Sequence, residues 1–298
     1  MNEKIKAKVI EQLLDKFLIS FDDKLEVALI RKNAKKNKVI VGDNVIVSKI
    51  GQDFVIENIL DRKNELIRPK VSNIDMLVIV TSIENPKPDF LLLDKQILLC
   101  YQKNITPLIC VNKCDYIDSS SDAKKIQEYI ENVYVKLGFD VVFTSAKNNI
   151  GIDILKEKIK GKTVAFSGNS GVGKSSITKC YIKDKKIETN EIARKTKRGR
   201  HTTKSAVIYK LEDDTFILDT PGFSSYELFD FNPKDLKKYY ADFNDSFCDF
   251  DDCNHVLEKE NVCDVKRNLK NGNIDKGRYD RYVYIYNTLK EAYDKRYK

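Results

Sequence analysis

The stretch Thr163-Val164-Ala165-Phe166-Ser167-Gly168-Asn169-Ser170-Gly171-Val172-Gly173-Lys174-Ser175-Ser176 decides the fold of this chain. Its first five residues predict a buried strand, and the G-x-x-x-x-G-K-S pattern that follows predicts a phosphate-binding loop (P-loop) that opens a helix. The glycines let backbone N–H groups converge on phosphate oxygens, where the helix N-terminus adds the positive end of its dipole. Lys174 is expected to bridge the outer phosphates, and the Ser175 hydroxyl is expected to bind Mg²⁺. A chance glycine-rich turn is the alternative, which the strand–loop–helix setting disfavours.

A second motif, Asn112-Lys113-Cys114-Asp115, follows a predicted strand at residues 107–111 and indicates which base is bound. The Asp115 carboxylate can accept both the N1–H and the 2-amino hydrogens of guanine, a pair of donors that adenine lacks. Asn112 would brace the loop and reach N7, while the Lys113 stem would cover the base. Further along the chain, Thr144-Ser145-Ala146-Lys147 would supply a backbone N–H to the guanine 6-oxygen. Each match alone is also compatible with a solvated turn, but together with the P-loop they favour GTP over ATP.

Two more segments are candidates for sensing the γ-phosphate. Asp219-Thr220-Pro221-Gly222 ends a predicted strand, so that Asp219 suits the water-mediated shell of Mg²⁺ and the Gly222 amide suits the γ-phosphate. Gly199-Arg200-His201-Thr202-Thr203-Lys204 is the expected first switch, in which either Thr202 or Thr203 completes the Mg²⁺ shell. These two segments are the predicted switches of a nucleotide-dependent protein.

Phe223 follows Gly222, at a position where many small GTPases carry a glutamine that orients the attacking water. Because an apolar side chain cannot hydrogen-bond to water, another group must orient the water or hydrolysis is slow. We expect His201 to be that catalytic group, since it lies next to the metal-binding threonines. A loop histidine that merely packs or contacts RNA is the alternative.

The order of these motifs differs from that of ordinary GTP-binding domains, which run from P-loop through switches to base-reading loops. Here the base-reading motifs at residues 112–115 and 144–147 come first, the P-loop follows, and residues 219–222 come last. A rotated order implies a circularly permuted domain. The second switch then lies at the end of the domain, directly before the C-terminal part of the chain.

Hydrophobic patterning predicts three parts. Short strands are expected at residues 25–30, 39–41, 44–50 and 53–60. They fit a small barrel, for which the OB fold is the natural candidate, although periodicity alone does not exclude other barrels. After residue 73, strands at residues 76–81, 107–111, 141–143, 164–167 and 216–218 alternate with helices at residues 90–101, 123–137 and 152–159. This βα alternation predicts an α/β domain, and a charged helix is expected from about residue 275.

Three of the seven cysteines cluster near the C-terminus in the pattern Cys248-x4-Cys253-x-His255-x7-Cys263. Three thiolates and one imidazole match a closed tetrahedral Zn²⁺ site, whose binding free energy would fold a small lobe. Since all four ligands come from protein, we expect a structural site without catalysis. Redox thiols are the alternative, but the chain has no C-x-x-C pattern. The predicted domains are therefore a barrel at residues 1–68, a permuted α/β domain at residues 69–225 and a mostly helical zinc domain at residues 226–298.

The bulk composition is that of an ordinary folded protein, with 42% hydrophobic and 33% charged residues. The first residues lack a signal peptide, and no apolar run is long enough to span a bilayer, so we expect a cytoplasmic monomer without membrane contact. Basic residues gather at residues 31–38 and 193–200 in a chain of net charge +8. Such clusters can bind nucleic-acid phosphates, although a solvated lysine-rich surface is the alternative.

Taken together, these segments resemble the RsgA family of circularly permuted bacterial GTPases, which depend on the small ribosomal subunit. The resemblance covers essentially the whole chain, because the motif order, Gly199-Arg200-His201-Thr202-Thr203 and the Cys-Cys-His-Cys pattern coincide in it. It implies an OB fold, a GTPase domain and a zinc domain, with His201 as the catalytic histidine. It also implies a GTPase that is stimulated by the small subunit and acts late in its maturation. We expect the barrel and the zinc lobe of such a protein to hold rRNA from two sides.

Two other functions remain open at this level. A P-loop kinase would need an acceptor pocket and an acidic base, against which N-K-x-D and D-T-P-G argue. A zinc-stapled RNA-binding protein with a vestigial nucleotide site would not need Lys174, Ser175 and Asp219, all of which are present. The sequence therefore predicts a GTP-hydrolysing switch that binds RNA.

Overall fold

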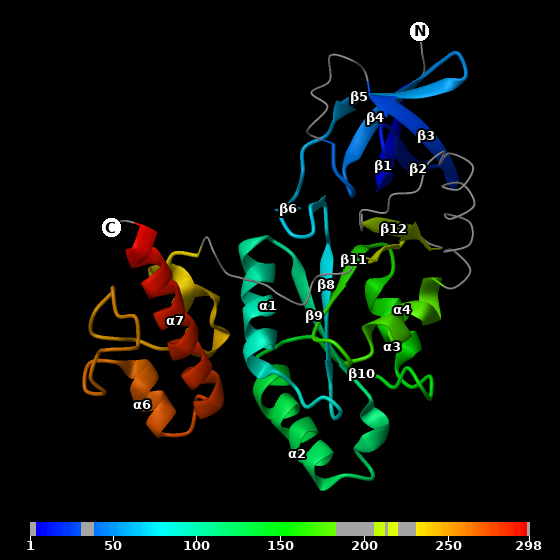
Figure 1. Cartoon of the computed structure of the whole chain (residues 1–298). Helices are drawn as coiled ribbons and strands as arrows, with labels where there is room; N and C mark the ends of the chain where they lie inside the picture. The colour runs from blue at the N-terminus through cyan, green and yellow to red at the C-terminus, as the bar shows by residue number, and fades with distance from the viewer. Residues whose placement is uncertain (1–3, 31–38, 183–205, 212–213, 220–230, 297–298) are drawn as a thin grey trace.

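The computed structural model describes residues 4–30, 39–182, 206–211, 214–219 and 231–296. Figure 1 shows a barrel at the top, a central sheet with helices on both sides, and a C-terminal lobe beside α1. The two basic clusters at residues 31–38 and 193–200 lie outside the described residues. No helix in the described part of the chain combines the length and apolar character needed to cross a membrane.

The N-terminal barrel closes through five strands. They are β1 (Lys4–Gln12), β2 (Phe17–Phe21), β3 (Lys24–Ile30), β4 (Asn44–Ile50) and β5 (Asp53–Ile59). Pairing runs β1–β2–β3–β5–β4, and β4 pairs back with β1, while β3 and β5 are parallel. Inward residues such as Val9, Val47 and Ile56 fill the barrel and are fully buried. A closed five-stranded barrel of this kind confirms the expected OB-like fold.

Sequence reasoning missed β1 and β2, for two physical reasons. All five residues of β2 are buried, so the strand shows no alternation of apolar and polar residues. In β1 the register shifts between Val9 and Glu11, which interrupts the period of two. The expected strand at residues 39–41 is reduced to a single bridge between Val41 and Val71.

A central, mostly parallel sheet follows the barrel. Its strands are β8 (Met76–Ser82), β9 (Thr106–Asn112), β10 (Val141–Phe143), β11 (Thr163–Ser167), β12 (Val207–Lys210) and β13 (Phe216–Asp219). Their order is β10–β9–β8–β11–β13–β12, with β12 antiparallel to β13. The hairpin β6 (Glu65–Leu66) and β7 (Val71–Ser72) connects barrel and sheet, and β1 of the barrel also pairs with β12. The strand that carries the P-loop, β11, therefore lies in the middle of the sheet.

Helices cover both faces of this sheet (Figure 1). They are α1 (Phe90–Gln102), α2 (Ser121–Ile130), α3 (Ile152–Ile159) and α4 (Lys174–Ile182), with the short turns η1 (Cys114–Tyr116) and η2 (Glu131–Val135). Along β8, Leu77 and Ile79 join the core on the side of α1, whereas Val78 and Val80 join the core on the side of α3. This alternation is the pleat of a strand that is buried on both faces. The helix expected at residues 123–137 instead changes to a π-helical turn after Ile130.

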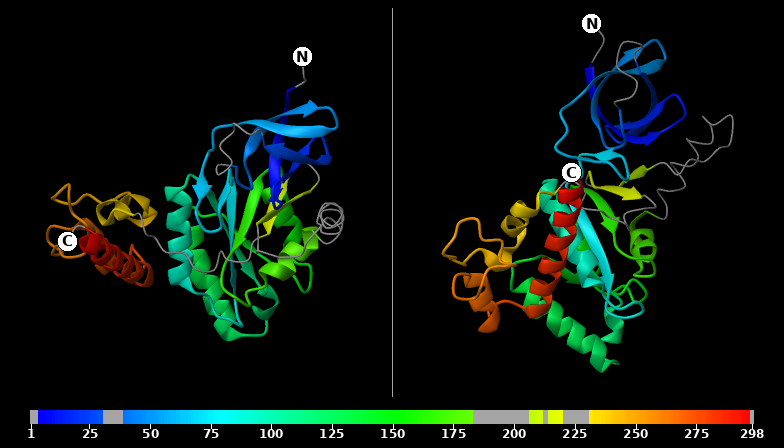
Figure 2. Two further views of the ribbon diagram at one scale, coloured as in Figure 1. Left: turned by 45° about the horizontal axis from the view of Figure 1, so that its top comes forward. Right: turned by 60° about the vertical axis from the view of Figure 1, so that its left-hand side comes forward.

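The C-terminal lobe is small and mostly helical. It contains η3 (Pro233–Tyr239), η4 (Ala241–Phe243), α6 (Asp264–Lys270) and α7 (Lys276–Arg296). Figure 2 shows α7 running alongside the α/β domain, where it contacts α1. The metal-ligand candidates lie in the irregular segment between η4 and α6.

A buried ionic network fastens this lobe to the α/β domain. Asp94 of α1 is 1% exposed, and it pairs with Arg278 at 2.5 Å and with Arg281 at 2.5 Å. Arg278 also pairs with Asp242 at 2.7 Å, and the Tyr134 hydroxyl donates to Asp94 at 2.8 Å. Because removing one partner of a buried pair leaves an unpaired charge, loss of any one member of this network would destabilise the contact between the lobe and α1.

Candidate functional site

The P-loop passes over the end of β11 and into α4, as its sequence predicts. Gly168 has φ +136°, and a Cβ there would lie 2.0 Å from the Val80 carbonyl oxygen, so only glycine fits this close approach to β8. The Lys174 ammonium donates to the carbonyls of Gly168 at 2.6 Å and Asn169 at 2.7 Å. Burial lowers the pKa of Lys174 from its usual value. Lys174 is therefore held directly over the loop whose backbone is expected to bind phosphate.

Asn112 joins the P-loop to both base-reading loops. Its Nδ2 donates to the Val172 carbonyl of the P-loop at 2.9 Å, across 60 residues of chain. Its Oδ1 accepts from the Ala146 N–H at 3.1 Å and from the Thr144 hydroxyl at 3.3 Å. The side chain is 2% exposed, so these bonds are shielded from competing water. One asparagine thus holds three motifs together that the sequence separates widely.

Asp115, the predicted base-reading carboxylate, is oriented by Ser145. The Ser145 hydroxyl donates to Asp115 Oδ1 at 2.6 Å and accepts from the Asn148 N–H at 3.3 Å. Lys113 has a left-handed backbone at φ +63°, and its ammonium donates to the Asn85 carbonyl. Because Ser145 fixes one oxygen of the carboxylate, its other oxygen and remaining lone pairs stay available to N–H donors of a base.

The predicted phosphate and base residues gather at one edge of the sheet. Asn112 ends β9, Thr144 follows β10, Gly168 follows β11 and Asp219 ends β13. Four parallel strands thus present their carboxyl ends together, where open α/β sheets bind ligands. Four of the predicted residues lie outside the described part of the chain, namely His201, Thr202, Thr203 and Gly222, and Asp219 is described by its backbone alone.

Helix α1 and its N-cap supply residues that the sequence pattern did not single out. The Gln96 amide donates to the Ser167 hydroxyl, directly before the P-loop, at 2.6 Å, and both side chains are buried. Asp89, the N-cap of α1, accepts from the Asn169 amide at 3.3 Å. The available signal was a polar run, Asp94, Lys95 and Gln96, inside the otherwise apolar stretch at residues 90–100, of which Asp94 and Gln96 are buried. Buried polar side chains need partners, so these two pointed to packing contacts of α1.

A substitution at Gly173 tests the hydrogen bond by which Asn112 connects the P-loop to the base-reading loop. It has φ +97°, and a Cβ there would lie 2.1 Å from Asn112 Nδ2. Gly173→Ala is therefore expected to break the bond between Asn112 and Val172 and to weaken GDP and GTP binding about ten- to a hundred-fold. Titration with a fluorescent guanine nucleotide measures the change.

Gly138→Ala is the matched control, since Gly138 has φ +84° but a Cβ added there would have no other atom within 4 Å. It introduces the same backbone strain without the clash. Equal nucleotide affinity in both variants would contradict the role given to Asn112.

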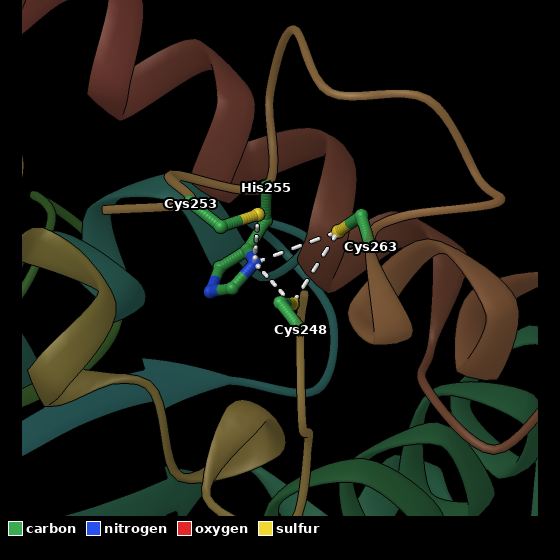
Figure 3. A group of neighbouring side chains, drawn as sticks. All are labelled: Cys248, Cys253, His255 and Cys263. Carbon is green, nitrogen blue, oxygen red and sulfur yellow. Dashed lines mark hydrogen bonds between the residues drawn. The ribbon is translucent and has the colours of Figure 1, made fainter. Parts of the chain in front are cut away.

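The second candidate site is a cluster of Cys248, Cys253, His255 and Cys263 in the C-terminal lobe (Figure 3). His255 Nδ1 lies 3.5, 3.3 and 3.5 Å from the sulfurs of Cys248, Cys253 and Cys263 respectively. The sulfurs of Cys248 and Cys263 are 3.9 Å apart, and all four ligand atoms lie within 4.8 Å of one another. A Zn²⁺ ion with ordinary bond lengths needs ligand–ligand distances of about 3.5–3.8 Å. The donor set and its spacing therefore fit a tetrahedral metal site.

The surroundings of this cluster favour metal binding. Burial lowers the pKa of His255 to about 4, so its imidazole is neutral and its nitrogen lone pair is available at neutral pH. The Tyr279 hydroxyl donates to the His255 carbonyl at 2.6 Å, and Phe243 packs edge-on against the ring at 5.2 Å. The Asp264 N–H donates to the Cys248 sulfur at 3.3 Å, which stabilises a thiolate. Such support from neighbouring groups is typical of a structural site.

Comparisons with known proteins agree with this geometry. The model of the RsgA GTPase family matches residues 59–229. A small ribosomal subunit biogenesis GTPase RsgA from Thermotoga neapolitana is 39% identical over 253 residues, which cover 85% of this chain and 84% of the relative. The crystal structure of YjeQ from Thermotoga maritima has a TM-score of 0.82 at 31% identity, covering 96% of this chain and 99% of its own. YloQ, described as a circularly permuted GTPase, has a TM-score of 0.79 at 27% identity, covering 97% and 96%.

Proposed function

The chain belongs to the RsgA GTPase family, and on this premise we propose that it hydrolyses GTP to GDP and phosphate while docked on the small ribosomal subunit. Its relatives are named as GTPases of small ribosomal subunit biogenesis, which supports a role in that process. We propose in addition that the protein docks on the small subunit, that the subunit stimulates hydrolysis, and that the protein acts late in subunit maturation. The location that follows from this partner is the cytoplasm, with the protein acting as a monomer.

The observation that carries the proposal is the convergence of three loops on Asn112. A P-loop alone would serve any nucleoside triphosphate. Here the same buried side chain fixes the P-loop through Val172 and the base-reading loop through Ala146, while Ser145 orients Asp115 beside it. The loops proposed to bind phosphate and guanine are thereby joined by hydrogen bonds, which supports GTP as the nucleotide.

Each predicted residue has a role in this proposal. The backbone N–H groups of residues 168–176 and the Lys174 ammonium would hold the phosphates, and Asp115 with the Ala146 and Lys147 backbone would hold the guanine base. Ser175, one of Thr202 and Thr203, and the Asp219 shell would hold Mg²⁺, which neutralises charge on the phosphates. Gly222 would contact the γ-phosphate, and His201 would orient the attacking water in place of the glutamine that Phe223 replaces.

We further propose the three-part division at residues 1–68, 69–225 and 226–298, with an OB barrel that contacts rRNA. The C-terminal lobe would hold one structural Zn²⁺ at Cys248, Cys253, His255 and Cys263. The pairing of β1 with β12 supports a mechanical link, because β12 and β13 form the hairpin that joins the two expected switches. A nucleotide-dependent movement of the switches would then be transmitted to the barrel through these strands.

The test is GTP turnover with and without purified small subunits, for wild type, Lys174→Ala and His201→Ala. We expect slow turnover of the protein alone, at least about tenfold stimulation by subunits, and loss of stimulated turnover in both variants, with nucleotide binding retained in His201→Ala. Labelled GTP should yield free phosphate, whereas a labelled acceptor would indicate a kinase. An unchanged rate in the presence of subunits would overturn the docking proposal.

A further inference from the structure

Large apolar side chains are exposed around the metal-ligand cluster. Phe247 and Leu257 are each 81% exposed, and Phe250 is 56% exposed. Phe247 precedes Cys248 directly, while Phe250 and Leu257 each lie two residues after a ligand, Cys248 and His255. Because the ligand atoms lie within 4.8 Å of one another, the three residues that bear these side chains belong to one small region of the chain. Clustered exposed apolar groups of this size mark interaction surfaces more often than single ones do.

The same region is strongly acidic. Residues 242–264 contain eight aspartates and glutamates and one lysine, in a chain whose net charge is +8. Three of these carboxylates, Asp242, Glu260 and Asp264, pair with cations of the lobe. Four others are exposed and have no ion pair within the part of the chain that the structure describes: Asp245, Asp249, Asp251 and Asp252. The surface around the metal cluster therefore carries a sign opposite to that of the whole protein.

Two nearby lysines, Lys237 and Lys266, bond to backbone carbonyls of the acidic segment and not to its carboxylates. The Lys237 ammonium donates to the backbone carbonyls of Asp251 and Cys253, each at 2.8 Å. The Lys266 ammonium donates to the carbonyls of Val256 at 2.8 Å and Glu258 at 2.6 Å. Both lysines thus fix the shape of the acidic loops and leave their carboxylates to solvent.

We propose that residues 245–257, the acidic-aromatic loops, dock a lysine- and arginine-rich polypeptide segment of the small subunit and do not contact rRNA. RNA phosphates would be repelled by four unpaired carboxylates, whereas a basic segment would pair with them. Exposed phenylalanine rings add faces on which guanidinium groups stack. This inference rests on the proposed function for its partner, and it changes the expectation that barrel and zinc lobe both hold rRNA.

The proposal is tested by whether the affinity for small subunits falls or rises when carboxylates of these loops are neutralised. In the full-length, zinc-loaded protein, Asp249→Asn/Asp251→Asn/Asp252→Asn removes three carboxylates without shortening a side chain. We expect about tenfold weaker binding to small subunits, because attraction to a basic segment is lost. Contact with rRNA predicts the reverse, namely tighter binding after repulsion is removed. Equal or tighter binding by this variant overturns the proposal.

The matched control removes the same charge elsewhere, through Glu128→Gln/Asp153→Asn/Glu157→Gln on exposed positions of α2 and α3. Its affinity for subunits should stay within about twofold of wild type, since distant exposed charges are largely screened. Zinc content and subunit-free GTP turnover should match wild type in both variants. If wild type itself fails to bind subunits, the proposed function fails; if wild type binds and the acidic variant binds equally, only the docking inference fails.

A cross-linking experiment identifies the class of partner. Phe250→p-benzoylphenylalanine in the full-length protein, irradiated on small subunits, should give a product that survives ribonuclease and contains a subunit protein. Ile154, 58% exposed on α3, is the control position for the same substitution and should not yield that product. Cross-linking from position 250 to rRNA, or only to a second copy of this chain, would overturn the proposal.

Discussion

Asp115→Asn is expected to lower the affinity for GTP by at least about a thousandfold and to create a preference for XTP. The carboxylate can accept the N1–H and the 2-amino hydrogens of guanine, whereas an asparagine amide would point its own hydrogens at the 2-amino group. Xanthine carries an oxygen at that position, so the amide can donate to it and still accept the N1–H. Ser145 holds the side chain at 2.6 Å in the present structure and can donate equally to an amide oxygen. The change therefore alters recognition with little effect on the fold.

Competition between GTP and XTP for a fluorescent guanine nucleotide measures this switch. Asp118→Asn is the matched control, because Asp118 is an exposed carboxylate three residues further along the same loop. Its affinities should remain those of wild type. If Asp115→Asn binds GTP as wild type does, the assignment of the base-reading loop is wrong, and XTP binding by that variant shows independently that the site is folded.

Cys263→Ser is expected to abolish metal binding and to unfold the C-terminal lobe, leaving the nucleotide site able to bind. Structural zinc contributes about 10–16 kcal/mol of apparent binding free energy in small zinc-dependent domains, more than a lobe of this size can replace by packing. The buried Cys263 belongs to the same core as Tyr282 and Leu289 of α7, so loss of the metal should release that helix as well. Metal analysis should find about one equivalent of zinc in wild type and none in the variant.

Hydrogen exchange localises the effect: protection should be lost in residues 233–296 and retained in β8, β9 and β11. Cys180→Ser is the control, since Cys180 is an exposed cysteine outside the cluster. Burial raises the pKa of Cys253 to about 12 and also raises that of Cys263, so both thiols carry protons in the metal-free protein at neutral pH. Zinc binding must release these protons, and its apparent affinity should fall as the pH is lowered. Retention of protection in metal-free Cys263→Ser would refute a structural role for the ion.

Structural features that depend only on neighbouring residues could be predicted from the sequence. The strand Val141–Phe143 and the helix Ile152–Ile159 occur at the expected residues, because hydrophobic period and flanking residues suffice to define them. The circularly permuted GTPase fold is likewise confirmed by the solved structures to which the chain is similar. The cysteine and histidine spacing predicted a cluster that the structure brings within 4.8 Å. The catalytic role of His201 and the domain boundaries stay predictions.

Features that depend on distant residues could not be predicted in this way. The pairing of Asp94 with Arg278 spans 184 residues, and that of Gln96 with Ser167 spans 71. Nothing in the local pattern of α1 states which buried partner satisfies a polar side chain. The helix expected at residues 123–137 is present up to Val135, but local pattern did not indicate that it becomes π-helical after Ile130, the part from which Tyr134 reaches Asp94.

The sequence by itself determined that this chain carries a permuted GTP-binding domain, since the P-loop and the base-reading loops are short motifs defined by neighbouring residues. A P-loop is formed by glycines, which allow its unusual backbone conformation, and by the helix that follows it. Consecutive residues therefore suffice to define its phosphate-binding chemistry. Only the tertiary structure decided that Asn112 joins the phosphate and base loops, that α1 lies between the P-loop and the C-terminal lobe, and that the metal cluster stands on an acidic, aromatic surface. Those arrangements follow from strand order and helix packing, in which each contact depends on where the rest of the chain has placed its partner.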